Sequence, residues 1–111
     1  MGNESKDKPR ILIVDDVETN RFTLRDIIAD MGCQPILTEN GEQALKIVER
    51  FPLSLIISDV AMPVMDGYEA TRIIRNKIRG GSEIPIIALS ANAFERDKIN
   101  SLRAGMNAHL S

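Results

Sequence analysis

Polar residues that could carry chemistry follow three apolar runs of this chain. They are Asp15 and Asp16 after residues 11–14, Asp59 after residues 53–58, and Ser90 after residues 85–89. Such runs are typical of buried strands, and the reactive groups of an open α/β sheet lie beyond the carboxyl ends of its strands. Three carboxylates that converge there repel one another unless a hard cation holds them together, and Mg²⁺ prefers such oxygen ligands. The spacing therefore indicates a metal-assisted phosphoryl-transfer site in which one carboxylate is the nucleophile.

Each of these residues also has a simpler interpretation. Asp15 or Asp16 could cap the helix that follows, because aspartate is among the best capping residues. Asp59 could be a turn residue after a buried strand, and Ser90 could be a small residue that closes a strand. Only the conjunction of all four favours a functional site. His109 is the one histidine of the chain, and as a lone histidine it is not assigned to the metal.

Composition excludes several classes of protein. The 111 residues hold 14 Lys and Arg against 16 Asp and Glu, and this net charge of −2 without a basic cluster argues against a nucleic-acid surface. The apolar runs are far shorter than the roughly 20 residues that span a bilayer, so no membrane contact is expected. Residues 1–9 form a polar tail without the apolar core of a signal peptide, and residues 10–111 form one domain. The single Cys33 fits a reducing compartment, and we expect a cytoplasmic location.

Apolar periodicity predicts strands that alternate with helices. The strands are expected at 11–14, 34–38, 53–58 and 85–89, with the start of another at 108–110, and the helices at 18–31, between Asn40 and Pro52, from Asp66 to before Gly80, and at 92–104. This alternation predicts a doubly wound parallel sheet with helices on both faces.

Single residues refine these predicted helices. Asn40 and Asp66 are the expected N-caps, and Gly32 and Gly105 the expected left-handed C-caps. The apolar face of the first helix is predicted to carry Leu24, Ile27, Ile28 and Met31. The basic residues of the third helix are interpreted as a solvated face. These residues are Arg72, Arg75, Lys77 and Arg79.

Four segments resemble the response-regulator receiver domains of two-component signalling. They are ILIVDD at 11–16, SDVAMPVMDG at 58–67, PIIALSA at 85–91 and AGMN at 104–107. They occur in the family's order, and the likeness extends from residue 10 to residue 111. The amino-acid sequences of these segments are most similar to those of receivers in hybrid sensor histidine kinases. The resemblance implies a flavodoxin-like, CheY-like sheet with strand order 2-1-3-4-5.

The same resemblance implies a function in a phosphorelay. Asp59 would accept a phosphoryl group from a phosphohistidine of a histidine kinase or a histidine phosphotransfer domain, and an acyl phosphate would result. Mg²⁺ would be bound by Asp16, Asp59 and the backbone carbonyl of Ala61, with Asp15 acting directly or through water. Receivers of this kind catalyse their own phosphorylation and dephosphorylation, but they are mainly signalling domains.

Two further positions match the switch residues of the family. Ser90 matches the hydroxyl that turns toward the phosphoryl group, and His109 falls where receivers usually carry a switch aromatic. Coupling would then extend from Asp59 through Ser90 to the fourth helix and last strand, as a population shift between two conformations.

The chain departs from the family at its end. Receivers carry a Lys just after the position of Ser111, and they have a fifth helix beside the first. We therefore expect an incomplete last strand, retained Mg²⁺ binding, slow phosphorylation, and self-association through the uncovered sheet face. The alternative function is a receiver-like interaction module that is not competent for normal phosphorylation.

Two other classes fit less well. A haloacid-dehalogenase-like phosphatase would need an acid two residues after its nucleophile, where this chain has Val17. A flavodoxin-like module for flavin or nucleotide would need a glycine-rich loop after the first strand, which the sequence lacks.

Overall fold

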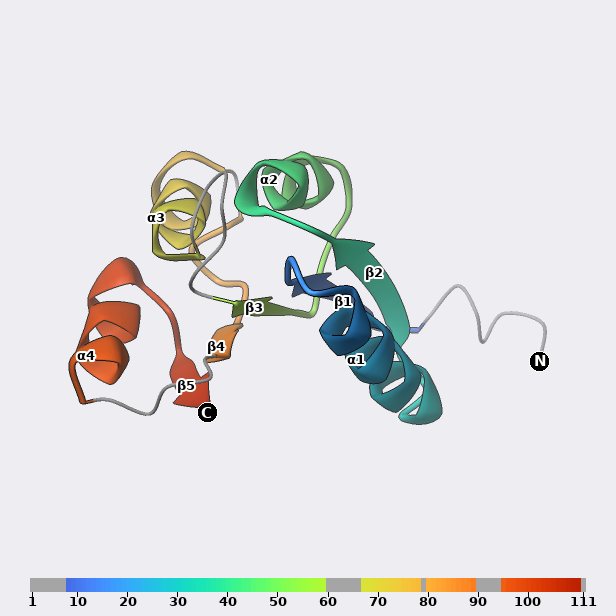
Figure 1. Ribbon diagram of the computed structural model, residues 1–111. Coiled ribbons are helices and arrows are strands. Elements are labelled where there is room, and N and C mark those ends of the chain that lie inside the picture. The colour runs from blue at the N-terminus through green and yellow to red at the C-terminus, as the bar shows by residue number, and fades with distance from the viewer. Residues whose placement is uncertain (1–7, 60–66, 79, 90–94, 111) are drawn as a thin grey trace.

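The chain forms five strands and four helices in the regions that the computed structural model describes, which are residues 8–59, 67–78, 80–89 and 95–110. Along the chain these elements are β1 (Arg10–Val14), α1 (Glu18–Asp30), β2 (Gln34–Thr38), α2 (Gly41–Arg50), β3 (Leu55–Asp59), α3 (Gly67–Lys77), β4 (Ile86–Leu89), α4 (Glu95–Ala104) and β5 (Ala108–Leu110) (Figure 1). The alternation of strands and helices predicted from periodicity is confirmed. The clearest difference in bounds is β3, which begins two residues later than predicted and includes Asp59 as its last residue.

The strands form one parallel sheet in the order β2-β1-β3-β4-β5. This is the predicted order. The register pairs Leu12 of β1 with Ile36 of β2 and with Ile56 of β3. Because all strands run the same way, their carboxyl ends meet at one edge of the sheet, and this is the edge where the polar residues of β1 and β3 lie.

Helices cover both faces of the sheet. Figure 1 shows α2 and α3 on one side and α1 on the other. Successive residues of β1 point to opposite faces, so Leu12 and Val14 join the core beneath α2 and α3, whereas Ile11 and Ile13 pack with Ile28 of α1. This burial on both sides explains the uninterrupted apolar run in β1.

The observed helix ends agree with some of the predicted cap residues and differ from others. The side chain of Asn40 accepts a hydrogen bond from the Gln43 amide at 2.9 Å and caps α2, as predicted. Gly32 and Gly105 have φ of 82° and 108°, so both lie in the left-handed region as predicted. The interpretation of Asp15 or Asp16 as the cap of α1 is wrong, because the cap residue is Val17, without a side-chain bond. The predicted cap Asp66 lies outside the described residues.

The apolar face of the first helix is buried only in part. Ile28 is the buried residue of α1, and Leu24 packs partly against the same cluster. Ile27 and Met31 share the predicted apolar face but are 50% and 68% exposed, so α1 presents apolar surface beside the sheet, as the departure from the family at the chain's end led us to expect. None of the helices in the described part of the chain is long and apolar enough to cross a membrane.

Candidate metal centre

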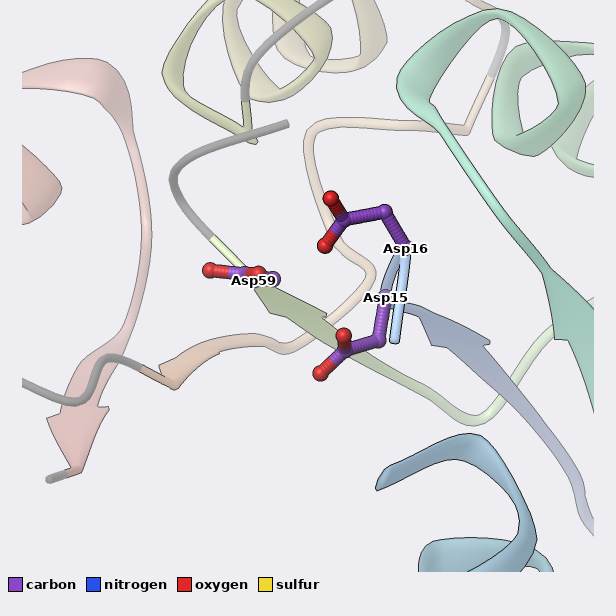
Figure 2. A group of neighbouring side chains, drawn as sticks. All are labelled: Asp15, Asp16 and Asp59. Carbon is purple, nitrogen blue, oxygen red and sulfur yellow. The ribbon is translucent and has the colours of Figure 1, made fainter. Parts of the chain in front are cut away.

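Three carboxylates from two strand ends lie together at the carboxyl edge of the sheet. One oxygen from each of Asp15, Asp16 and Asp59 lies within 4.8 Å of the other two. Figure 2 shows these side chains around a common space beyond β1 and β3. Asp15 is buried, Asp59 is half-buried and Asp16 is exposed, so the cluster opens toward solvent on one side. The structure thus brings together the three aspartates that the sequence singled out.

The register of the central strands accounts for this meeting. Val14 of β1 pairs with Ser58 of β3, so the next residues of the two strands, Asp15 and Asp59, follow at the same level of the sheet. The hydroxyl of Ser58 donates to the carbonyl oxygen of Asp59 at 3.0 Å. Asp16 follows Asp15 directly and extends beyond the strand end. A shift of one residue in this register would turn one aspartate to the other face.

Asp15 is held by several hydrogen bonds. Its amide donates to the carbonyl oxygen of Thr38 at 3.1 Å, which continues the pairing of β1 with β2 by one residue. Its Oδ1 accepts from the Val17 amide at 2.9 Å, and its Oδ2 accepts from Nδ2 of Asn20 at 3.4 Å. Nη1 of Arg21 donates to its carbonyl oxygen at 2.8 Å. Both carboxylate oxygens of Asp15 are therefore oriented by α1 and the turn before it.

The charges and the donor atoms fit a hard divalent cation. Among the described residues, neither Asp15 nor Asp16 forms an ion pair with a basic side chain. The cluster contains only carboxylate oxygens, without histidine or cysteine. Mg²⁺ prefers such ligands, keeps several waters, and usually binds through one or two carboxylates together with phosphate oxygens. The donor set therefore fits Mg²⁺ better than a softer transition metal.

The other predicted site residues lie elsewhere or are not described. Ala61 and Ser90 fall outside the described residues. His109 lies on β5, where it pairs with Ala88 of β4. Its Nδ1 lies 2.7 Å from Oγ of Ser101 on α4, and its buried Nε2 has no hydrogen-bond partner in the part of the chain that the structure describes. The histidine is therefore outside the carboxylate cluster, and its role as a switch residue stays a prediction.

Sequence reasoning missed the structural importance of Arg75. Arg72 and Lys77 are exposed, as expected of a solvated face, but Arg75 is half-buried and makes four hydrogen bonds. The interpretation of this helix face as solvated is therefore wrong for Arg75. A signal was present, since Arg75 follows the buried Thr71 by four residues and so lies on the inward side of α3.

Comparisons with known proteins agree with the fold and with the carboxylate cluster. The family model of the response regulator receiver domain matches residues 11–111. The chain belongs to the receiver domain family. The receiver domain of the sensor histidine kinase PA1611 from Pseudomonas aeruginosa PAO1, solved with a magnesium ion coordinated in its active site cleft, is 39% identical. It superposes with a TM-score of 0.86 over 94% of this chain and 84% of that chain.

Two further relatives show the settings in which similar receiver domains occur. The sensor histidine kinase GacS of Pseudomonas protegens is 37% identical over 105 residues, which are 93% of this chain and 12% of that protein. This chain therefore spans only a small part of the curated kinases that it matches. The receiver domain of Ssk1 from Saccharomyces cerevisiae was solved in complex with the histidine phosphotransfer protein Ypd1. It is 31% identical, with a TM-score of 0.85 over 93% of this chain and 77% of that chain.

Proposed function

We propose that this receiver domain accepts a phosphoryl group on Asp59 from a phosphohistidine of a histidine kinase or a histidine phosphotransfer domain. The observation that carries the proposal is the meeting of Asp15, Asp16 and Asp59 within 4.8 Å at the carboxyl edge of a receiver sheet. Asp16 and Asp59 would hold Mg²⁺ with the backbone carbonyl of Ala61, and Asp15 would act directly or through a water. Ser90 and His109 are the proposed switch positions.

The surroundings of the three carboxylates support Asp59 as the nucleophile. Both oxygens of Asp15 already accept hydrogen bonds, so this residue is suited to a fixed ligand role. Asp59 is half-buried at the end of the central strand β3, where a phosphoryl group could approach from the open side. An oxygen of Asp59 would form a bond to phosphorus while the N–P bond of the phosphohistidine breaks, and the bonding electron pair would return to the imidazole nitrogen.

Mg²⁺, when bound, would neutralise the negative charge on the transferred phosphoryl oxygens. The chain's own contribution is to bring the carboxylates together at fixed positions. The Asp15 amide bond to Thr38 and the pairing of Val14 with Ser58 hold the two strand ends in place before the reaction. Such preorganisation lowers the barrier because little rearrangement is needed when charge develops.

The relatives support the class of partner. The complex of the Ssk1 receiver with Ypd1 is an example of a similar domain bound to a histidine phosphotransfer protein. The likeness to GacS supports a setting within a histidine kinase relay. Because such relays begin with phosphorylation by ATP, we propose a cytoplasmic location for the reaction.

Labelling by a small phosphodonor tests this function. We expect Mg²⁺-dependent incorporation of label from acetyl phosphate into the wild-type chain, and loss of labelling in Asp59→Asn. Glu83→Gln is the matched control, because it also removes one negative charge but lies in the turn before β4, at the opposite edge of the sheet. Labelling that persists in Asp59→Asn would contradict the assignment. A folded, Mg²⁺-binding wild-type chain that takes no label would instead favour an interaction module that works without phosphorylation.

A further inference from the structure

The guanidinium of Arg75 joins two turns that lie far apart in the sequence. Its Nη1 donates to the carbonyl oxygens of Gly81 and Ile84, at 2.7 and 2.6 Å, in the turn between α3 and β4. Its Nε donates to the carbonyl oxygen of Gly105 at 2.8 Å, in the turn between α4 and β5. Among the described residues no carboxylate pairs with Arg75, so neutral oxygens surround its charge. Burial lowers the pKa of Arg75 from its ordinary value.

The same guanidinium orients the residue that begins the pairing of β5. Nη2 of Arg75 donates to Oδ1 of Asn107 at 2.7 Å. This oxygen also accepts from the Ile86 amide at 2.8 Å, while the Asn107 amide donates to the carbonyl oxygen of Ile86 at 2.7 Å. The first regular pair between β4 and β5, Ile87 with Ala108, follows directly. Arg75 thus acts on the position of β5 through Asn107.

The two turns approach α3 closely at glycine positions. Gly105 has φ of +108°, and a Cβ at this residue would lie 2.9 Å from Cγ of Arg75. A Cβ at Gly81 would overlap the carbonyl oxygen of Ile74. Side chains at either glycine would therefore push the turns away from Arg75, which requires both carbonyl oxygens at hydrogen-bond distance.

The described side chains of α4 bury little apolar surface. Its buried residues between positions 99 and 104 are the small Ser101 and Ala104, whereas Ile99 and Leu102 are 45% and 59% exposed. The contact of Ser101 Oγ with His109 Nδ1, at 2.7 Å, joins α4 to β5. We call residues 95–110 the α4–β5 unit. It packs against α3, pairs with β4, and is hydrogen-bonded to Arg75 at its turn.

The two ends of α4 lie at opposite edges of the sheet. Its first turn follows the carboxyl end of β4, at the edge where Asp59 ends β3, whereas Gly105 and Asn107 come just before β5 at the other edge. We propose that Arg75 is a positioning residue that pins the α4–β5 unit at the edge far from Asp59. Through Asn107, Arg75 thereby sets the position from which β5 responds to the carboxylate site. Only this response rests on the proposed function, because the pin exists without it.

Hydrogen exchange of the metal-free full chain tests the pin by itself. Arg75→Met removes the donors at similar side-chain length, Arg75→Lys keeps the charge without the planar fork, and Arg72→Met is the control at an exposed position of the same helix. We expect the protection of the Asn107 and Gly105 amides to fall about ten- to hundredfold in Arg75→Met, with less change in the amides of β1. We expect a smaller loss in Arg75→Lys and none in Arg72→Met. If Arg75→Met does not fold, Asn107→Ala removes one of the four acceptors and carries the same expectation.

Backbone chemical shifts then test the coupling. Mg²⁺ with beryllofluoride is the probe of the phosphorylated state. When it is added to wild type, we expect the backbone chemical shifts of Asp16, Ala108 and His109 to change. Arg75→Met should keep the shift at Asp16 and change those of Ala108 and His109. A purely structural Arg75 would raise exchange equally in β1 and β5 and leave the probe-induced shifts as in wild type, and that result would overturn the inference. If beryllofluoride with Mg²⁺ changes no chemical shift in wild type, the proposed function is wrong. The hydrogen-exchange data then still decide whether Arg75 pins the α4–β5 unit.

Discussion

Removal of one carboxylate should stabilise the metal-free domain. One oxygen of Asp16 lies within 4.8 Å of an oxygen from each of Asp15 and Asp59. Two unit charges at that distance repel by about 0.9 kcal/mol in bulk water and by about 3.5 kcal/mol at an effective dielectric constant of about 20. Asp16 is exposed, so the lower figure applies to each of its two pairs, and salt reduces it further. We expect Asp16→Asn to raise the free energy of unfolding by about 1–2 kcal/mol without metal.

Mg²⁺ should reverse this order of stability. A ligand that binds only the folded state stabilises it by about 2.7 kcal/mol when its concentration is about a hundred times the dissociation constant. Wild type should gain this amount, whereas Asp16→Asn, which lacks one proposed ligand, should gain little. The midpoint of urea unfolding, followed by circular dichroism with EDTA and with Mg²⁺, measures both effects.

A control variant and two possible outcomes decide whether the prediction for Asp16→Asn holds. Glu83→Gln removes a negative charge at the opposite edge of the sheet, so it should change neither the metal-free stability nor the response to Mg²⁺. If Asp16→Asn is no more stable than wild type in EDTA, the three carboxylates do not repel as the distances imply. If Mg²⁺ stabilises wild type and Asp16→Asn equally, the cation binds elsewhere.

One further prediction concerns the buried core of the domain, and another concerns the exposed surface of α1. Leu12 is fully buried, so Leu12→Ala should lower the free energy of unfolding by about 2–5 kcal/mol in urea titrations, and Leu102→Ala, at an exposed position, by less than about 0.5 kcal/mol. Equal losses would show that the core is not where the structure has it. Ile27 and Met31 are exposed apolar residues of one helix and its end, so we expect self-association that Ile27→Lys weakens without loss of stability. Sedimentation that shows a monomeric wild type at all concentrations would refute this.

Much of the fold follows from local patterns in the sequence. The run in β1 predicts a strand buried on both faces because no polar residue interrupts it. Asn40 and Gly32 mark helix ends through a side-chain acceptor and a left-handed backbone, and both effects act within a few residues. The meeting of Asp15 with Asp59 was also predictable, since parallel strands share one carboxyl edge.

Other features depend on atoms that only the tertiary structure brings together. Periodicity placed Ile27 on the apolar face of α1, but its burial depends on which elements pack there, and the described ones leave it half exposed. The acceptors of Arg75 are mostly backbone carbonyl oxygens, which every residue carries and which no side-chain pattern reveals. The sequence by itself therefore determined the elements and the acidic edge, because these depend on short-range periodicity and strand direction. The tertiary structure decided the pinning of β5 through Arg75, because that depends on a turn about thirty residues from Arg75 in the sequence meeting its guanidinium.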